Sequence, residues 1–312
     1  MKRLEGFLYI DEYQKEPANV HQKKTNLYWL YINGEEYYFK PSNNYYNELI
    51  GYHAATFLGI DACSCDLAIL NGQKGIISKS LRKENTHLTS GYDILNEYVY
   101  SGLSNLYWIK KMMNQTDILK KWWFNDKYRD KSDLIANGIN DLENIWHALE
   151  YKYQDDKRFN IEKVMNQIVI MYIYSLLSYD TDKYATNWLI EENKTDIRLA
   201  PIYDNEDAFN YTKDKLNQKN RFSSSTTPET YDYNQLEAIN IFLSISSSEF
   251  SNLFYNMYEK LLDNFDKIIK NVEIQTGVSI PLTKKLTITN GFYKNMEQIR
   301  NHLEQYKTSK NK

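Results

Sequence analysis

Two carboxylate residues and an asparagine have the types and the spacing that phosphoryl transfer requires. Asp182 and Asn187 lie five residues apart after a strongly apolar segment, and Asp204 follows Asn187 by seventeen residues. When ATP donates a phosphoryl group, one carboxylate orients the acceptor hydroxyl and accepts its proton. An Asn and a second carboxylate hold Mg²⁺ against the phosphates. The three residues therefore predict a site for ATP and Mg²⁺.

A fourth residue of this site, Lys40, lies far upstream at the end of a predicted strand. A Lys on a strand of a small lobe can neutralise the negative charge of the phosphates from the side of that lobe. Asp and Asn also favour ordinary turns, so the interpretation depends on the four residues together. Asp180 competes with Asp182 as the carboxylate that accepts the proton. Only Asp182 has the five-residue spacing to Asn187, and Asp180 is expected to be a helix-end or solvated carboxylate.

The first eighty or so residues alternate between short apolar runs and turn signals, which indicates strands. Asn33-Gly34 predicts a tight hairpin turn, because both central positions of the favoured turn need a positive φ. A helix that ends at Gly59 is expected between two strand pairs, which suggests a small antiparallel sheet with one helix packed on it. The predicted strands are 7–10, 27–32, 35–40, 66–70 and 75–80, and the predicted helix is 47–58.

Beyond about residue 89, apolar residues recur at three- and four-residue spacing, which is typical of helices. The predicted helices are 91–100, 116–124, 131–136, 141–153, 161–179, 249–275 and 283–306, with short strands at 188–190 and 197–199 and a serine-rich loop at 223–228. The predicted fold class is therefore α+β with two lobes. A small β-rich lobe covers residues 1–87, and a larger helical lobe covers residues 88–312.

The composition excludes several classes of protein. The 312 residues carry a formal charge of −3, so charge alone does not predict binding to nucleic acid. The two cysteines, Cys63 and Cys65, provide neither a disulfide framework nor a closed zinc site, and are expected to be structural. The apolar run over 168–177 is shorter than the ~20 residues of a membrane span, and no signal peptide is expected. A soluble, cytoplasmic protein is predicted.

Five segments resemble, in the right order, motifs of the HipA-like serine/threonine kinases, and together they cover about residues 7 to 210. The chain resembles in particular the short HipA-related kinases that lack the usual N-terminal subdomain. The segments are Gln22-Lys23-Lys24-Thr25 of the phosphate loop, Tyr38-Phe39-Lys40-Pro41 of the ATP-lysine strand, the helix from Asn47-Glu48 to Leu58-Gly59-Ile60, the catalytic loop from Asp182 to Asn187, and Ala200-Pro201-Ile202-Tyr203-Asp204. The resemblance implies a two-lobed, protein-kinase-like fold and an ATP- and Mg²⁺-dependent serine/threonine protein kinase.

The resemblance also implies roles for individual residues. Asp182 would be the catalytic base, Asn187 and Asp204 would ligate Mg²⁺, and Glu48 would anchor its helix near Lys40. The strand over 76–81 would meet adenine through its backbone. The residues implied to contact ATP are His21, Gln22, Lys24, Lys40, Ser78, Lys79, Ser80, Lys183 and Asn187.

The same resemblance implies the toxin of a bacterial toxin–antitoxin system. Its partners would be a small DNA-binding antitoxin and a protein substrate, such as an aminoacyl-tRNA synthetase or another translation factor. A protein-kinase effector with a different target is an equally open alternative. Neither a membrane partner nor direct binding to nucleic acid is expected.

Two departures from the family pattern keep other functions open. The catalytic loop reads Asp182-Lys183-Tyr184 where the family has D-R-H, and Lys is not a bidentate donor like Arg. The segment 14–24 contains no Gly, although glycines normally let backbone N–H groups approach phosphates. A pseudokinase that binds through the same fold is therefore the alternative to an active kinase. A third alternative keeps the fold but transfers the phosphate to a small molecule or nucleotide.

Overall fold

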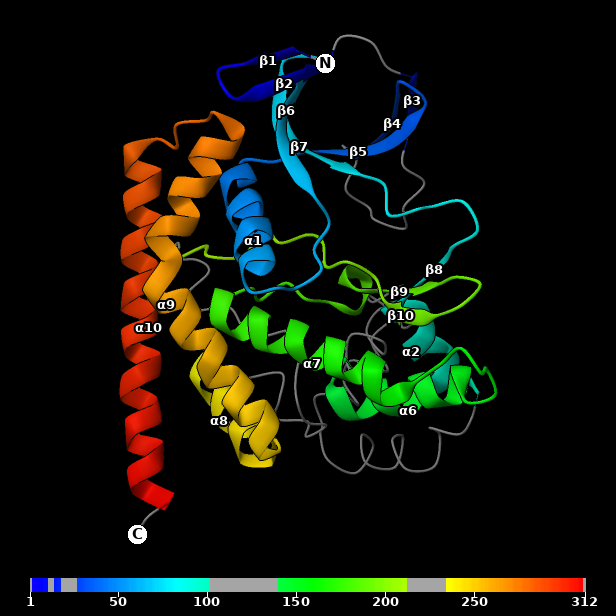
Figure 1. Cartoon of the computed structure of the whole chain (residues 1–312), viewed down its shortest axis with the longest axis vertical. Coiled ribbons are helices and arrows are strands. Elements are labelled where there is room, and N and C mark those ends of the chain that lie inside the picture. Colours follow the sequence, from blue (N-terminus) through cyan, green and yellow to red (C-terminus); the bar gives the residue numbers. More distant parts are fainter. Residues whose placement is uncertain (1, 11–13, 18–26, 102–139, 212–233, 311–312) are drawn as a thin grey trace, which may run out of the picture.

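The computed structural model describes residues 2–10, 14–17, 27–101, 140–211 and 234–310, and shows a sheet at one end of a mainly helical body (Figure 1). This mixed architecture agrees with the predicted α+β class. The helices predicted at 116–124 and 131–136, the serine-rich loop at 223–228, and the predicted ATP contacts His21, Gln22 and Lys24 lie outside the described residues.

A seven-stranded sheet forms the smaller, β-rich lobe. Its strands are β1 (Lys2–Leu4), β2 (Phe7–Ile10), β3 (Gln14–Pro17), β4 (Tyr28–Ile32), β5 (Glu35–Pro41), β6 (Cys65–Leu70) and β7 (Gln73–Lys79). Their order across the sheet is β1-β2-β6-β7-β5-β4-β3. The expectation of an antiparallel sheet is wrong in one place, because β2 pairs with β6 in parallel.

Two tight turns set the register of the hairpins in this sheet. Asn33 and Gly34 connect β4 to β5 with φ angles of 53° and 79°, and Asn71 and Gly72 connect β6 to β7 with φ angles of 50° and 77°. Gly and Asn adopt this left-handed conformation more readily than other residues. The predicted turn at Asn33-Gly34 is confirmed. Lys40 consequently lies near the end of β5, the strand that leads to the helical part of the lobe.

Helix α1 (Tyr45–Phe57) contacts β6 and β7 of this sheet. Leu49, Ile50 and Ala54 are fully buried, and they share a core cluster with Leu67 and Ile76 of the two strands. Burial of this apolar stripe holds α1 on the sheet. The helix predicted at 47–58 is confirmed.

The larger lobe contains the helices α2 (Gly91–Tyr100), α6 (Leu142–Tyr153), α7 (Ile161–Ser178), α8 (Gln235–Ile245), α9 (Ser248–Thr276) and α10 (Leu282–Lys310). A second sheet has the order β10-β9-β8, with β8 at His87–Ser90, β9 at Leu189–Glu192 and β10 at Ile197–Leu199. The predicted division after residue 87 thus falls inside β8. Within the described part of the chain, no helix combines the length and the apolar character of a membrane span.

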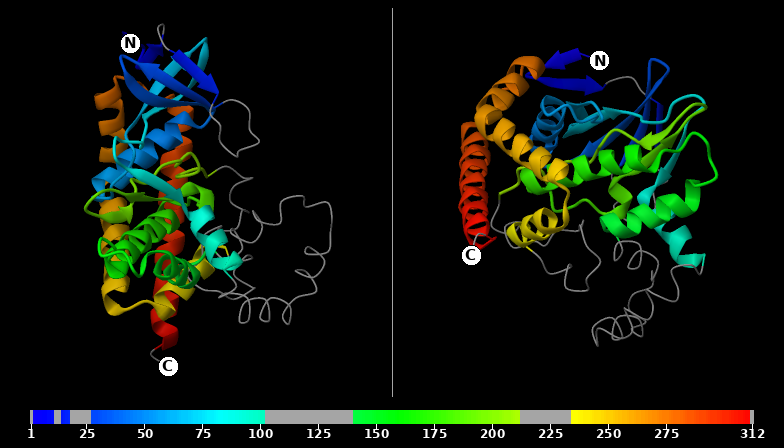
Figure 2. Two further views of the ribbon diagram at one scale, coloured as in Figure 1. Left: turned by 90° about the vertical axis from the view of Figure 1, so that its right-hand side faces the viewer. Right: turned by 60° about the horizontal axis from the view of Figure 1, so that its bottom comes forward.

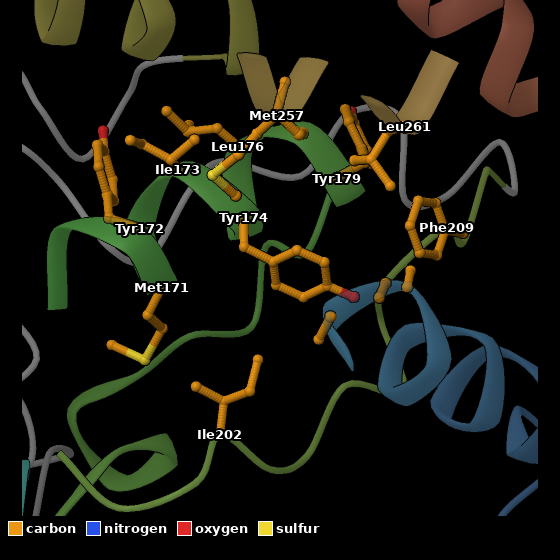
Figure 3. Close-up of a cluster of buried hydrophobic side chains, with 14 of the residues drawn as sticks. Met171, Tyr172, Ile173, Tyr174, Leu176, Tyr179, Ile202, Phe209, Met257 and Leu261 are labelled. Atoms are coloured by element: carbon orange, nitrogen blue, oxygen red, sulfur yellow. The ribbon is translucent and has the colours of Figure 1, made fainter. Parts of the chain in front are cut away.

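Helix α7 lies at the centre of the helical lobe, and its residues 171–178 are all buried (Figure 3). The Tyr174 hydroxyl donates a hydrogen bond to the backbone oxygen of Gly51 in α1 (2.6 Å). Tyr179 caps the helix in the left-handed conformation, with a φ of 58°. The central helix is therefore tied to the β-rich lobe and ends beside it, where the chain continues as the predicted catalytic loop.

The long helices α9 and α10 run side by side and connect the two lobes (Figure 2). Helix α9 contacts both α1 and α7. At its end, the Arg3 guanidinium donates a hydrogen bond to the backbone oxygen of Thr276 (2.9 Å). Gly6 lies so close to Val278 that an added Cβ would be 1.9 Å from its Cγ2 atom. These contacts hold the β-rich lobe against the helical lobe, and the candidate site lies between them.

Candidate active site

The predicted catalytic loop follows helix α7 directly and ends in a short 3-10 helix at Ala185–Asn187. The side-chain amide of Asn187 donates a hydrogen bond to the backbone oxygen of Asp182 (2.5 Å). Its Oδ1 atom accepts a hydrogen bond from the Thr186 hydroxyl (3.3 Å). The first bond closes the five-residue loop and fixes the orientation of the Asn187 amide, so the loop has one defined shape.

Lys40 and Asp204 form the contact at the centre of the site. Asp204 lies in residues 200–205, the metal segment, which follows β10. The Lys40 Nζ atom lies 2.5 Å from Asp204 Oδ1 and 3.1 Å from Glu206 Oε2. Burial lowers the pKa of the Lys40 ammonium, but these carboxylates outweigh burial, so its pKa lies above its usual range. The structure thus brings together two predicted site residues that are 164 positions apart. Glu206 was not anticipated, since no motif marks it.

The surroundings of Asp182 suit a group that accepts a proton near neutral pH. Burial, followed by the negative charges of Asp204 and Asp207, raises the pKa of Asp182 to about 7. A general base is most effective when its pKa lies close to the working pH. The charge of Asp204 therefore acts on the carboxylate that is proposed to accept the proton.

Glu48 of α1 lies near enough to Lys40 for its carboxylate to raise the pKa of that ammonium, and it also contacts the metal segment. Its Oε1 atom accepts a hydrogen bond from the backbone N–H of Asn205 (2.8 Å), so α1 is bonded directly to the metal segment. Burial, and then the charge of Asp204, raises the pKa of Glu48 to about 7. The neighbouring Asn47 donates from its amide to the backbone oxygen of Ala208 (3.0 Å). Helix α1 therefore positions the backbone on the C-terminal side of Asp204.

Asp180 and Lys183 form an ion pair inside the protein, with 3.0 Å between Nζ and Oδ2 and both side chains fully enclosed. Of the two alternatives expected for Asp180, the helix-end position agrees with the structure, since the residue follows the C-cap of α7, whereas the solvated carboxylate is wrong because the side chain is enclosed. The Lys183 ammonium also donates to the backbone oxygens of Tyr203 and Asp204, each at 2.9 Å. Contact between Lys183 and ATP stays a prediction, but its ammonium points into the protein toward the metal segment.

The predicted adenine-binding residues lie at the end of β7. Ser78 and Lys79 belong to that strand, which pairs with β5 and β6, and Ser80 follows it directly. The Ser80 N–H donates to the backbone oxygen of Glu36 (3.0 Å). The Lys79 ammonium pairs with Glu35 at the surface (2.6 Å). Contact of Ser78, Lys79 and Ser80 with ATP stays a prediction.

The two cysteines lie beside this strand. Burial raises the pKa of the Cys63 thiol to about 11 and raises the pKa of Cys65 well above its ordinary value. A thiol that remains protonated is a poor nucleophile and a poor metal ligand. These shifts agree with the structural role expected for both residues.

A group of aromatic side chains lies next to the Lys40–Asp204 pair. Tyr38, two residues before Lys40, packs edge-on against Trp29 of β4 with 5.3 Å between ring centroids. The Arg82 guanidinium lies over the Trp29 ring at 4.7 Å from its centroid. Burial, and then the charge of Asp204, raises the pKa of Tyr38 above its usual range. This group was not anticipated from the sequence, because aromatic residues are frequent in the chain and no spacing distinguishes these two.

The side chains of the site provide only part of the oxygen ligands that Mg²⁺ needs, so the remaining ligands have to come from another molecule. Within the described residues, no group of three or more His, Cys, Asp or Glu side chains could hold a metal ion. Asp204 and Asn187 each offer one oxygen-bearing side chain, and Mg²⁺ prefers oxygen ligands. In nucleotide sites this ion is usually held by one or two carboxylates, with phosphates and waters completing the shell. The donor set is therefore of the kind that holds Mg²⁺ with a nucleotide.

Comparison of the chain with known proteins gives matches among solved structures alone. No family model matches the sequence, and no curated protein matches it. The structure of the Helicobacter pylori proinflammatory kinase CtkA matches with a TM-score of 0.65 and 12% identity, over 95% of this chain and 96% of that chain. A chain of the Shewanella oneidensis MR-1 toxin–antitoxin complex of HipA, HipB and operator DNA matches with a TM-score of 0.55 and 15% identity, over 95% of this chain and 67% of that chain.

The chain has a HipA-like kinase fold. Both matches cover almost the whole chain. The similarity in fold therefore includes α9 and α10, whereas the sequence motifs cover only about residues 7 to 210. In this chain, β5 with Lys40 precedes α1, and the segment with Asp204 follows β10. At these identities the comparison establishes the fold, and activity has to be argued from the site.

Proposed function

We propose that the protein is an ATP- and Mg²⁺-dependent serine/threonine protein kinase of the HipA-like type. The main support is the contact between Lys40 and Asp204, which joins the β-rich lobe to the metal segment. In protein kinases, the Lys that meets the phosphates and the Asp that holds Mg²⁺ both have to be in place for transfer. The kinase fold of the structural neighbours supports the same proposal.

Each residue of the site has one role in this proposal. Asp182 orients the hydroxyl group of a Ser or Thr and accepts its proton. Asn187 and Asp204 hold Mg²⁺, which neutralises negative charge on the phosphates when bound. Lys40 exchanges its carboxylate partners for phosphate oxygens. Tyr38 lies beside Lys40 and offers a ring surface to the nucleotide.

Incubation with γ-labelled ATP and Mg²⁺ tests the proposal. The wild-type protein should transfer label to itself or to a generic protein substrate. Asp182→Asn and Asp204→Ala should each lower the rate about 100-fold or more, because groups of this kind act in the transition state. Asp196→Asn is a matched control, since Asp196 pairs with Lys163 at the surface (2.7 Å). Equal labelling of the wild type and the two site variants would refute the assigned roles.

A pseudokinase is the second candidate, and Glu206 favours it. Its carboxylate lies 3.1 Å from Lys40 and accepts a hydrogen bond from Ser42 (3.1 Å). Phosphates must therefore displace two carboxylates from Lys40 before they can bind. A titration of the protein with ATP in the presence of Mg²⁺ separates the candidates. Tight binding without transfer to any acceptor would favour the pseudokinase, and transfer that Asp182→Asn abolishes would exclude it.

The biological partners belong to the same proposal. One structural neighbour is a chain of a complex of HipA, HipB and operator DNA, and we propose a small DNA-binding antitoxin as a partner of this chain. The proposed substrate is a protein, such as an aminoacyl-tRNA synthetase or another translation factor, in the cytoplasm. Growth arrest on expression of the wild type but not of Asp182→Asn would support the toxin role. Equal arrest by both would oppose it.

A further inference from the structure

Lys183 is the most completely enclosed cation in the described part of the site. Its ammonium lies 3.0 Å from Asp180 Oδ2, 2.9 Å from the backbone oxygens of Tyr203 and Asp204, and 3.1 Å from Asn205 Oδ1. The side chain has no exposed surface. An ammonium group has three protons to donate, and these four oxygens provide an acceptor for each of them.

The acceptors of Lys183 belong to two different segments. Asp180 lies two residues before the catalytic loop, whereas three of the four oxygens belong to the metal segment. The backbone of Lys183 is fixed as well, because its oxygen accepts a hydrogen bond from the Asn140 amide (2.8 Å). One side chain thus ties the loop that carries the base to the segment that carries the metal carboxylate.

Asp204 needs such support because of its backbone conformation. Its φ angle is 55°, a left-handed conformation that is unfavourable for residues other than Gly unless the surroundings hold it. Lys183 binds the backbone oxygen of Asp204 on one side. On the other side, Glu48 binds the N–H of the next residue, Asn205. The direction of the Asp204 carboxylate therefore depends on both contacts.

We infer that Lys183 is a positioning residue, which holds Asp204 at a fixed distance from the base Asp182 and does not touch the nucleotide. The inference rests on the proposed function and deepens it. It replaces the ATP contact that the sequence suggested for this residue. Since Lys183 directly follows Asp182, any shift of its side chain displaces the base and the metal carboxylate relative to each other. A misplacement of about 1 Å in an active site costs on the order of 100-fold in rate.

The test variant must remove the contacts between the Lys183 ammonium and the metal segment without leaving an unpaired charge in the core. Lys183→Met alone would leave the buried Asp180 carboxylate without a counter-charge, which is strongly destabilising and endangers folding. The double variant Lys183→Met with Asp180→Asn removes both charges together. The matched control is Lys163→Met with Asp196→Asn, which deletes a Lys–Asp pair (2.7 Å) at the surface. Circular dichroism and urea unfolding establish that each protein is folded.

Two readouts test the inference on folded protein. The first is the split between kcat and KM for ATP, where we expect kcat to fall about 100-fold and KM to change less than about threefold. The second is the ratio of the Kd for ATP without Mg²⁺ to the Kd at saturating Mg²⁺. We expect this ratio to be about tenfold smaller in the double variant, while the Kd without Mg²⁺ stays the same. A purely structural Lys183 would lower the stability of the fold and leave both quantities unchanged per folded molecule.

The outcomes separate this inference from the proposed function. If the wild type binds no ATP at all, the proposed function fails. If the wild type binds ATP and the double variant retains both kcat and the ratio of Kd values, Lys183 does not position Asp204. If affinity without Mg²⁺ falls tenfold in the double variant but not in the control, Lys183 contacts the nucleotide and the inference is overturned.

Discussion

The negative charge of Asp182 is expected to lower the free energy of unfolding of the protein. Its carboxylate is partly buried, and the negative charges of Asp204, Asp207 and Asp180 act on it. The Lys183 ammonium opposes them, but it lowers the pKa of Asp182 by less than each of these carboxylates raises it. The substitution Asp182→Asn keeps the shape of the side chain and removes the charge, so it should stabilise the protein at neutral pH while it abolishes phosphoryl transfer.

The expected gain follows from the pKa. Asp182 has a pKa of about 7 in the folded protein against 3.8 for an ordinary Asp. A difference of about three pKa units corresponds to about 4 kcal/mol once both states are ionised. The side chain is partly exposed and the Asn amide must also leave water, so we expect about 2 kcal/mol.

The sign of the pH dependence is fixed by the direction of the shift. Because the folded pKa lies above the unfolded one, ionisation of Asp182 costs the wild type no stability below about pH 4, and the cost grows as the pH rises to about 7. The difference between Asp182→Asn and the wild type should therefore be small near pH 4 and largest above pH 7.

Urea unfolding without Mg²⁺, at several pH values between 4 and 8, measures this difference. Asp196→Asn is the control, since removal of its surface pair with Lys163 should cost at most about 1 kcal/mol. If Asp182→Asn is no more stable than the wild type at pH 8, or if its advantage shrinks as the pH rises, the electrostatic description of the site is wrong.

Three further predictions concern other parts of the site. Gly51→Ala should destabilise the fold by about 1–3 kcal/mol in urea unfolding, because the new Cβ would lie 2.8 Å from the nearest atom of the metal segment; an unchanged midpoint would show that α1 can move away. Glu206→Gln should strengthen Mg²⁺–ATP binding several-fold in a titration, since it removes one carboxylate that competes with phosphate for Lys40; weaker binding would instead make Glu206 part of the nucleotide site. Cys63 and Cys65 should react with iodoacetamide at pH 8 at least about tenfold more slowly in the folded protein than in urea, as followed by mass spectrometry, because burial raises both thiol pKa values; equal rates would contradict their burial.

The elements that could be predicted are those whose signal is local. The hairpin turn at Asn33-Gly34 has both positive φ angles because of the residues it contains. The buried helix α7 follows from its apolar composition and ends where Tyr179 adopts a left-handed conformation. In both cases, neighbouring residues contain the information that determines the structure.

The missed strands depend on pairing with other strands, whereas the missed helix α8 has a local signal. Strand β1 is only three residues long and exists because it pairs with β2, and β2 in turn pairs in parallel with β6. Strand β8 pairs with β9, about one hundred residues later. Helix α8 has a complete capping box, with Asn234 and Glu237 bonded reciprocally. This last signal was present in the sequence as Asn-x-x-Glu and could have been used.

The candidate site also has a part that the sequence predicts and a part that it does not. The spacing of Asp182, Asn187 and Asp204 is a property of the sequence, and together with Lys40 it was enough to indicate one site. The direction of a charged side chain is not a property of the sequence. Lys183 resembles a phosphate contact by charge and position, yet burial turns its ammonium toward the metal segment. Glu48 was expected near Lys40, and nothing in its spacing indicated that it also accepts a hydrogen bond from the N–H of Asn205.

The balance of charge at the site leads to one more expectation about the nucleotide. Carboxylates outnumber ammonium groups there, and burial together with this excess of negative charge raises the pKa values of Asp182 and Glu48 to about 7. ATP adds further negative charge, so its approach to this surface is unfavourable unless a divalent cation accompanies it. Binding of ATP should therefore be much weaker in EDTA than in Mg²⁺, and the difference should narrow as the pH falls below 7 and the two carboxylates take up protons. ATP affinity that is independent of Mg²⁺ would mean that Lys40 alone offsets this charge, and the metal roles of Asn187 and Asp204 would lose their basis.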